Sequence, residues 1–222
     1  LTTVDSEIVG ISESTVVRFA TFLGYEGYPQ FQLAMEEMVK MRLNSIESDS
    51  VSNGNISQDG VLMSVLSADM SKIKTTMENI DEYVFDNAVE TLLNAKRIYV
   101  VGIRSCAPLA SFLGFYLNMI FDDVVLLTTN SASELFEQMI NISDEDCIIG
   151  ISFPRYSMRT LKALEFANSR QAKIITITDS IHSPMNLYSS CNLIAASEMT
   201  NIVDSLVAPL SVINALIIAL CR

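Results

Sequence analysis

The segment from residue 150 to 160, GISFPRYSMRT, combines hydroxyl groups with arginine where an apolar run gives way to a helical pattern. Ser152 ends the apolar run, and Ser157 falls at the helix start, where serine can cap the helix and contact a phosphate. Arg155 adds an always-charged guanidinium suited to phosphate. These residue types at this spacing indicate a site for a small anion. Taken alone, the same residues could be a helix cap and a solvated charge.

A second loop of this kind lies at Gly102–Pro108, GIRSCAP. Gly102 allows a tight turn, and Ser105 falls at the start of the next helical pattern, where free N–H groups and the helix dipole favour an anion. The loops match neither the GxxxxGK[ST] pattern nor a dinucleotide fingerprint, since GIRSCA lacks the second and third glycines. Two such loops after buried strands favour an anion site over two unrelated caps.

The elements that position these loops begin at Arg97, where short apolar runs rich in β-branched residues start. Helical patterns lie between the first four runs, at about 105–121, 130–142 and 157–170, and another precedes them at about 82–95. Strands buried on both faces that alternate with helices form parallel sheets. We therefore predict an α/β domain with a doubly wound, five-stranded parallel sheet in three layers. Ligands of such a sheet bind beyond the carboxyl ends of its strands. The runs are RIYVVGI, DVVLLT, CIIGIS, KIITIT and the weaker CNLIAA.

The whole chain divides into three parts. Residues 1–46 read as a small all-helical module, and residues 47–60, ESDSVSNGNISQDG, read as a linker because polar residues and glycine dominate. Residues 61–222 then form the α/β domain, which opens with a helix over about 62–80. We expect the chain to begin inside the helical module and to lack a few residues at its turn.

The stretch GISESTVVRF, residues 10–19, has the pattern of the turn and recognition helix of a helix-turn-helix. Gly10 permits a left-handed turn, while Val16, Phe19 and Leu23 repeat at helical spacing and predict the inner face. The remaining polar side chains can bond phosphates and base edges. A dimerisation arm without DNA contact is the alternative. The predicted DNA contacts are Ser12, Ser14, Thr15 and Arg18.

Composition narrows the function classes. The formal net charge of the 222 residues is −12, which argues against general affinity for nucleic acid or anionic membranes. Residues 1–46 hold three basic and six acidic residues, a net charge of −3, so this fragment alone should bind DNA weakly. Four cysteines without CxxC spacing predict reduced thiols in a cytoplasmic protein, and a single histidine argues against zinc.

The apolar C-terminal stretch, VDSLVAPLSVINALIIALCR, predicts a buried helix at a subunit interface rather than a membrane span, because Ser211 and Asn214 interrupt it. The chain shows no signal peptide at its start. We predict no cofactor and no membrane partner.

The motifs together resemble a known family. RIYVVGIRS, ISFPRYS and IITITDSIHSPMNLYSSCNLI resemble the SIS (sugar isomerase) domain, which binds phosphosugars. With GISESTVVRFATFLGYEGYPQFQ upstream, the whole chain resembles the RpiR/MurR family of bacterial transcription regulators. That resemblance implies an N-terminal helix-turn-helix and a C-terminal SIS effector domain. Because operator half-sites mirror protein two-fold symmetry, we expect a homodimer or higher homo-oligomer.

The resemblance also assigns residues. Ser105 matches the family's phosphate-binding serine, and Ser152 and Ser157 match the first and last positions of its SxSGxT pattern. Pro154 and Arg155 replace the middle serine and the glycine of that pattern, which removes one hydroxyl group and adds a cation. The TDSIHSP loop matches a family loop that lines the pocket. The predicted ligand-binding residues are Gly102, Arg104, Ser105, Ser152, Arg155, Tyr156, Ser157 and Ser183.

These observations predict a ligand-responsive, DNA-binding transcription regulator that senses a phosphorylated sugar or a related small anion, without catalysis. One alternative is a phosphosugar aldose–ketose isomerase, which needs a base to move a proton, and His182 or Glu198 is the candidate. A stand-alone isomerase has no use for a recognition helix. The other alternative is a sugar-phosphate sensor that acts through a protein partner.

Overall fold

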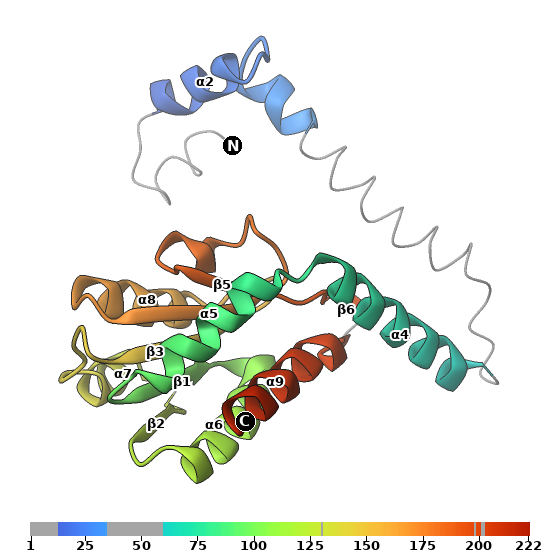
Figure 1. The fold of residues 1–222 in the computed structure, drawn as a ribbon. Helices are drawn as coiled ribbons and strands as arrows, with labels where there is room; N and C mark the ends of the chain where they lie inside the picture. The colour runs from blue at the N-terminus through green and yellow to red at the C-terminus, as the bar shows by residue number, and fades with distance from the viewer. Residues whose placement is uncertain (1–12, 35–59, 130, 198, 201–202) are drawn as a thin grey trace. The chain divides into compact units, whose positions relative to one another are not determined.

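The computed structural model describes residues 13–34, 60–129, 131–197, 199–200 and 203–222 (Figure 1). The chain divides into two compact units, Leu1–Ser64 and Val65–Arg222, and each is described by itself. Most of the predicted linker, residues 47–59, lies outside the described residues. The predicted domain limits at 46 and 60 therefore stay predictions.

The described part of the smaller unit begins with α2 (Glu13–Phe22). Gly24 has a left-handed φ of +90°, a conformation natural to glycine, and the chain is helical again from residue 28 to 34. The Phe31 ring packs edge-on against Phe19, with centroids 5.9 Å apart. Phe19 and Leu23, predicted to face inward, are about half exposed at 54% and 46%. Gly10 and Ser12 lie outside the described residues, so the helix-turn-helix stays a prediction.

A five-stranded, all-parallel sheet forms the centre of the larger unit, which confirms the predicted doubly wound α/β fold (Figure 1). Its order is β2-β1-β3-β4-β5, so the winding direction reverses between β1 and β3. In an open sheet this reversal point is where a ligand crevice forms. The strands are β1 (Ile98–Gly102), β2 (Val124–Leu127), β3 (Cys147–Ile151), β4 (Lys173–Thr178) and β5 (Cys191–Ile194).

Successive strand residues alternate between two core layers, because neighbouring side chains of a strand point to opposite faces. Ile98 and Val100 pack into one hydrophobic cluster, and Tyr99 and Val101 pack into the other. Helices α5 (Glu82–Leu93), α6 (Ala107–Ile120) and α9 (Val207–Leu220) cover the first face, and α7 (Ala132–Gln138) and α8 (Met158–Ser169) cover the second.

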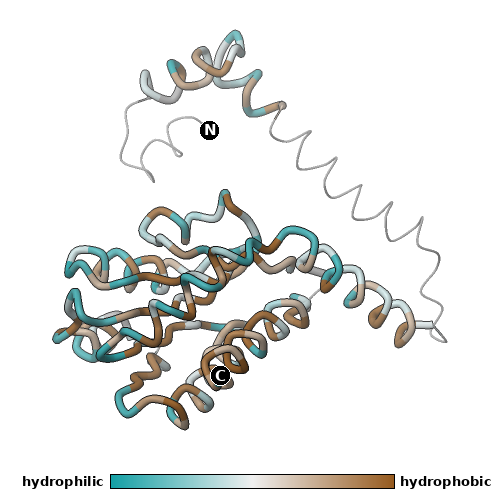
Figure 2. Tube along the Cα trace, viewed as in Figure 1, coloured by the Kyte–Doolittle hydropathy of each residue, from teal (hydrophilic) through white to brown (hydrophobic). Residues whose placement is uncertain are grey.

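Apolar colouring runs through the strands and along α9 in Figure 2. Half of the α9 side chains are buried, among them Ile213 and Leu216, so the predicted burial of this helix is confirmed. No described helix has the length and apolar character needed to cross a membrane. Helix α4 (Val61–Asn79) precedes α5 and keeps many of its apolar side chains exposed.

Two helices differ from the expected limits. The helix predicted from residue 105 begins as a short 3₁₀ turn, η1 (Arg104–Cys106), and becomes α-helical only at Ala107, with Pro108 in its first turn. The helix predicted over 130–142 ends at Gln138. The Asp146 carboxylate accepts hydrogen bonds from Ser143 N and Oγ at 2.8 and 3.0 Å, which stabilises a turn where the sequence pattern predicted more helix.

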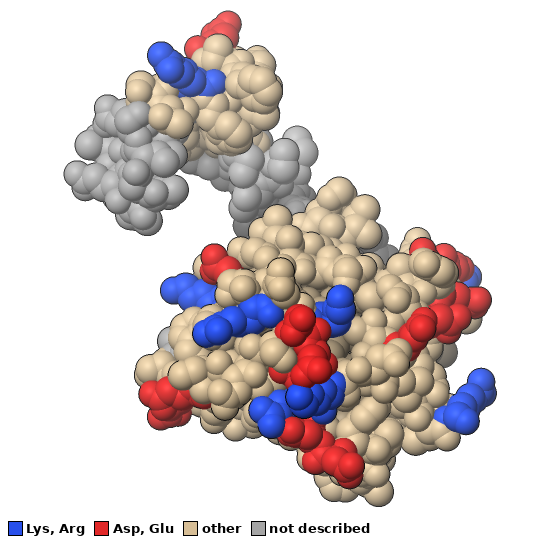
Figure 3. Space-filling view, turned by 60° about the vertical axis from the view of Figure 1, so that its left-hand side comes forward, with Lys and Arg blue, Asp and Glu red and all other residues tan. Residues whose placement is uncertain are grey.

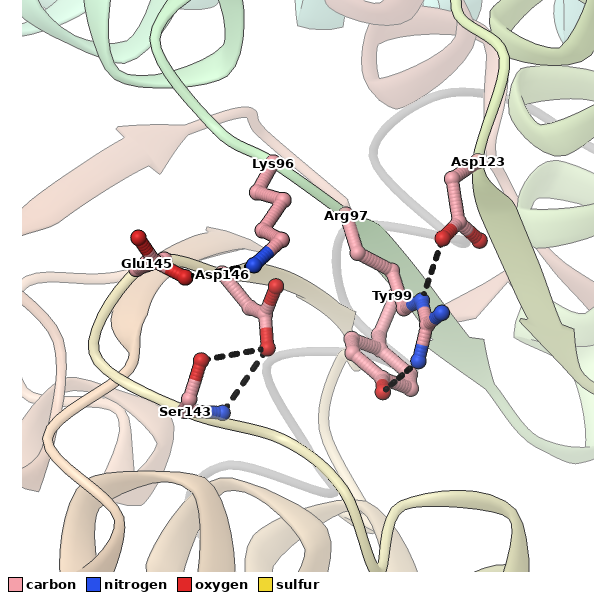
Figure 4. Close-up of polar contacts among 7 residues, drawn as sticks. All are labelled: Lys96, Arg97, Tyr99, Asp123, Ser143, Glu145 and Asp146. Atoms are coloured by element: carbon pink, nitrogen blue, oxygen red, sulfur yellow. Dashed lines mark hydrogen bonds and ion pairs between the residues drawn. The ribbon is translucent and has the colours of Figure 1, made fainter.

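Charged side chains at the amino end of the sheet pair with one another (Figure 4). Lys96 Nζ lies 2.7 Å from Glu145 Oε2, and Arg97 Nε lies 2.7 Å from Asp123 Oδ2. The first of these hydrogen bonds raises the pKa of Lys96 and lowers that of Glu145. Figure 3 likewise shows basic and acidic side chains next to each other on one face of the larger unit. The two loops predicted to bind an anion lie at the opposite, carboxyl end of the strands, after β1 and β3.

Candidate anion-binding site

A cleft of about 440 Å³ opens beyond the carboxyl ends of β1 and β3. These strands flank the point where the winding direction of the sheet reverses. Five predicted ligand residues, from the loops after both strands, line this one cleft. Its lining consists of Ile103, Arg104, Ser105, Cys106, Ser152, Phe153, Pro154, Arg155, Ser157, Asp204 and Leu206.

The serines after β3 hold the loop in shape. Ser152 is buried, and its Oγ accepts a hydrogen bond from Ser157 N at 3.2 Å. Ser157 is the N-cap of α8, and its Oγ accepts from Thr160 N at 3.5 Å. The predicted cap is therefore in place. Since Ser157 also lines the cleft, the N-terminal end of α8 borders it, and this is the end of a helix that favours negative charge.

Two arginines of the cleft have left-handed backbone conformations, Arg104 with φ of 60° and Arg155 with φ of 68°. Residues with a Cβ seldom adopt this region, and such strain collects at functional sites. Arg155 stands where the SxSGxT pattern has glycine. The loop therefore keeps a backbone conformation that glycine adopts readily, while its side chain now carries a cation into the cleft.

The guanidinium of Arg155 is paired inside the molecule. Its Nη2 lies 3.0 Å from both carboxylate oxygens of Asp204, which ends the two-residue strand β7 (Val203–Asp204). Burial raises the pKa of the Cys106 thiol, and the negative charge of Asp204 adds to this effect. Arg104 has no ion pair with any described residue. Among the described residues, one arginine of the cleft thus has an ion-pair partner and the other has none.

Three predicted ligand residues lie outside the cleft lining. Gly102 ends β1 behind the loop, and a Cβ there would lie 2.7 Å from the Cys106 carbonyl oxygen. Tyr156 donates from its hydroxyl to Asp179 Oδ1 at 2.8 Å, and burial together with this bond raises its pKa to about 12. Ser183 is buried, and its Oγ accepts from Thr178 Oγ1 at 2.9 Å. Their roles in binding stay predictions.

Asp204 is the charged residue of the cleft lining that the sequence did not predict. It follows the five apolar strand runs and belongs to no recognisable motif, so no sequence pattern points to it. Its place in the cleft depends on how β7 folds back toward the loop after β3. Its side chain is only 12% exposed. Among the described residues, no group of three His, Cys, Asp or Glu side chains could hold a metal ion.

The family model for the SIS domain matches residues 91–219, more than half of the chain. The chain belongs to the SIS domain family. The SIS domain of an RpiR transcription factor from Sphaerobacter thermophilus is 28% identical, with a TM-score of 0.70 over 73% of this chain and 90% of that one. Vibrio vulnificus NanR, solved as a complex with ManNAc-6P, is 20% identical, with a TM-score of 0.65 over 97% of this chain and 76% of that one.

The curated relatives with significant similarity are all named HTH-type transcriptional regulators. One of them, from Clostridium perfringens, is 24% identical over 86% of this chain and 68% of its own length. The chain spans 64% and 57% of two further relatives, so a third or more of such a regulator lies beyond the matched segment. The expected resemblance to SIS-containing regulators is confirmed.

Proposed function

We propose that this protein is a bacterial DNA-binding transcription regulator whose SIS domain senses a phosphorylated sugar or a related small anion. The observation that carries the proposal is the cleft at the ends of β1 and β3, which brings two arginines and three serines together in one SIS domain. Support comes from the regulator names of its relatives and from NanR, which binds ManNAc-6P. The proposed regulator acts in the cytoplasm.

In this proposal the cleft holds the phosphate group. Arg104 and Arg155 donate charge-assisted hydrogen bonds to its oxygens, and the serines of the lining, Ser105, Ser152 and Ser157, add hydroxyl donors. The amino end of α8 contributes its favourable dipole. The sugar then extends toward the open side of the cleft.

We propose that the cleft binds its ligand without isomerising it. Proton transfer between adjacent carbons needs a free base. Among the described residues that line the cleft, Asp204 is the one carboxylate, and it is paired with Arg155, while no histidine lines it. His182 is exposed in the loop after β4 and is not part of the lining. Glu198, the other candidate base, lies outside the described residues.

A thermal-shift screen of sugar phosphates against the full chain tests the sensing function. Because a ligand that binds only the folded state stabilises it, a compound at 100 times its Kd should raise the unfolding free energy by about 2.7 kcal/mol. The matching sugars without phosphate serve as controls and should give no shift. The same mixtures, assayed for isomers, should show no interconversion. A screen in which no phosphorylated compound shifts the melting temperature would contradict the proposal.

Arg18 provides the test of DNA binding. It is exposed on α2, the proposed recognition helix, and can contact phosphate or guanine. In a gel-shift assay on DNA upstream of the protein's own gene, Arg18→Ala should weaken DNA binding by about 1–3 kcal/mol, roughly 5- to 150-fold in affinity. The thermal shift with sugar phosphates should stay unchanged.

Lys162→Gln, which removes one exposed charge from α8, is the matched control for Arg18→Ala and should shift DNA as the unaltered protein does. Equal DNA affinity of Arg18→Ala and the unaltered protein would favour a sensor that acts through a protein partner.

We also propose that the regulator is a homodimer, since operator half-sites mirror a two-fold axis. Leu66, Met70, Ile73 and Met77 of α4 recur at helical spacing and are 39–71% exposed, next to an apolar cavity of about 370 Å³ between α4, α5 and α9. A second copy would cover this face. Met70→Glu should then shift the sedimentation coefficient toward that of a monomer, whereas Met158→Glu on α8 should not. A protein that sediments as a monomer without either change would contradict the proposal.

A further inference from the structure

The cleft contains an anion of its own. Asp204 presents both carboxylate oxygens to Nη2 of Arg155 at 3.0 Å. Its side chain is 12% exposed, whereas that of Arg155 is 60% exposed, so the carboxylate is enclosed while the guanidinium borders solvent. A phosphate that binds Arg155 meets a like charge already in contact with the same group, and like charges at this range repel.

The side chains of residues 204–206 point to two sides of the chain. Asp204 and Leu206 line the cleft, whereas Ser205 between them donates from Oγ to Asp69 Oδ1 on α4 at 2.6 Å. Such alternation is the geometry of an extended chain, whose successive side chains point to opposite sides. The Ser205 carbonyl also accepts a hydrogen bond from Ser197 Oγ at 3.0 Å. Asp204, which contacts Arg155, is thus the direct neighbour in sequence of the residue that contacts α4.

Two polar contacts hold α4 to the segment that follows β5. Besides the Asp69–Ser205 contact, Thr76 Oγ1 accepts from Ala196 N at 2.8 Å, and Thr76 is buried. Thr76 lies near the end of α4, and Asp69 lies two turns before it. Loss of the Ser205 contact alone would release the earlier part of α4, the part that follows residues 35–59 in the chain, and leave its end attached.

We propose that Asp204 is an internal counter-ion that the effector's phosphate displaces from Arg155, and that the displacement reaches α4 through Ser205. This inference rests on the proposed sensing function and adds a mechanism to it. In the free protein the Arg155–Asp204 pair and the Ser205–Asp69 contact exist together. In the bound protein the phosphate replaces the carboxylate, and the earlier part of α4 loses its attachment.

The first test measures affinity by calorimetry on the full chain, with inorganic phosphate and with ManNAc-6P as probes. Asp204→Asn removes the competing charge at nearly unchanged shape, so both probes should bind about tenfold more tightly. Asp122→Asn, which removes one exposed negative charge at the amino end of the sheet, is the matched control and should leave both affinities unchanged. Circular dichroism verifies that each variant is folded.

The second test measures hydrogen exchange in residues 65–79 of α4. In the unaltered protein, saturating phosphate should increase exchange before residue 73 and leave the part around Thr76 protected. Ser205→Ala should exchange fast there without phosphate and respond no further to it. It should also bind phosphate roughly 2- to 10-fold more tightly, because binding no longer has to break the Ser205–Asp69 contact.

The outcomes separate the inference from the function on which it depends. If neither probe nor any sugar phosphate of the thermal-shift screen binds any variant, Asp204→Asn included, both the sensing function and the inference fail. If the probes bind and Arg155→Gln removes binding, but Asp204→Asn binds equally or more weakly, the sensing function stands and the counter-ion role is wrong. If Asp204→Asn binds more tightly but exchange in α4 ignores phosphate, the transmission through Ser205 is wrong.

Discussion

Gly102→Ala is expected to destabilise the larger unit by about 3 kcal/mol, the upper part of the usual range for overpacking a core. An added Cβ would lie 2.7 Å from the Cys106 carbonyl oxygen and 2.9 Å from Ala110 Cβ. Both atoms belong to the backbone or to a side chain without rotamers, so neither can turn aside. Relief requires η1 and the start of α6 to move away from β1, which would also displace Arg104 and Ser105.

Two other glycines provide matched controls for Gly102→Ala. A Cβ on Gly150 would meet the ends of Leu164 and Met185 at 3.0–3.1 Å, and these flexible groups can shift, so a smaller loss of about 1 kcal/mol is expected. A Cβ on Gly114 would lie 3.3 Å from Leu126 Cδ1, and alanine is the better helix former by about 1 kcal/mol, so Gly114→Ala should be near neutral.

Thermal denaturation gives the measurement for the three glycine variants. For a unit of this size, a loss of 3 kcal/mol corresponds to a fall in Tm of roughly 10 °C. The order of destabilisation should be Gly102, then Gly150, then Gly114. If Gly102→Ala melted at the same temperature as the unaltered protein, the close packing of α6 on β1 would be wrong.

The sheet could be predicted from the sequence because buried parallel strands have a strong signature. Runs such as CIIGIS have no polar alternation, and each matched a strand within one or two residues. The ends of helices were less predictable, since they depend on groups distant in sequence. The turn after α7, for example, is held by the side chain of Asp146, beyond the helical pattern.

The candidate site was only partly predictable. The loops after β1 and β3 could be placed together, because parallel strands bring their carboxyl ends to one edge. The residue type at position 155 does not predict the left-handed backbone there, since arginine rarely adopts that conformation. The glycine at the same position of the SxSGxT pattern is the one indication of it. The Asp204 contact joins residues 49 apart in sequence and depends on the tertiary fold.

Removal of both cleft arginines should nearly abolish effector binding. A hydrogen bond to a charged group contributes about 1.5–3 kcal/mol, so Arg104→Gln with Arg155→Gln should weaken sugar-phosphate binding at least about 100-fold. The loss at Arg155 has a second component, because Asp204 is left without its partner and its full negative charge then faces the incoming phosphate.

This second component makes a prediction about charge pairing in the cleft. Adding Asp204→Asn to Arg155→Gln should restore part of the lost affinity. Adding it to Arg104→Gln should raise the affinity only by the tenfold expected for Asp204→Asn alone. Lys162→Gln with Lys173→Gln removes two exposed charges elsewhere and should bind as the unaltered protein does. Calorimetric titration with ManNAc-6P measures each case. Full binding by the protein without both arginines would show that the anion is held at another place.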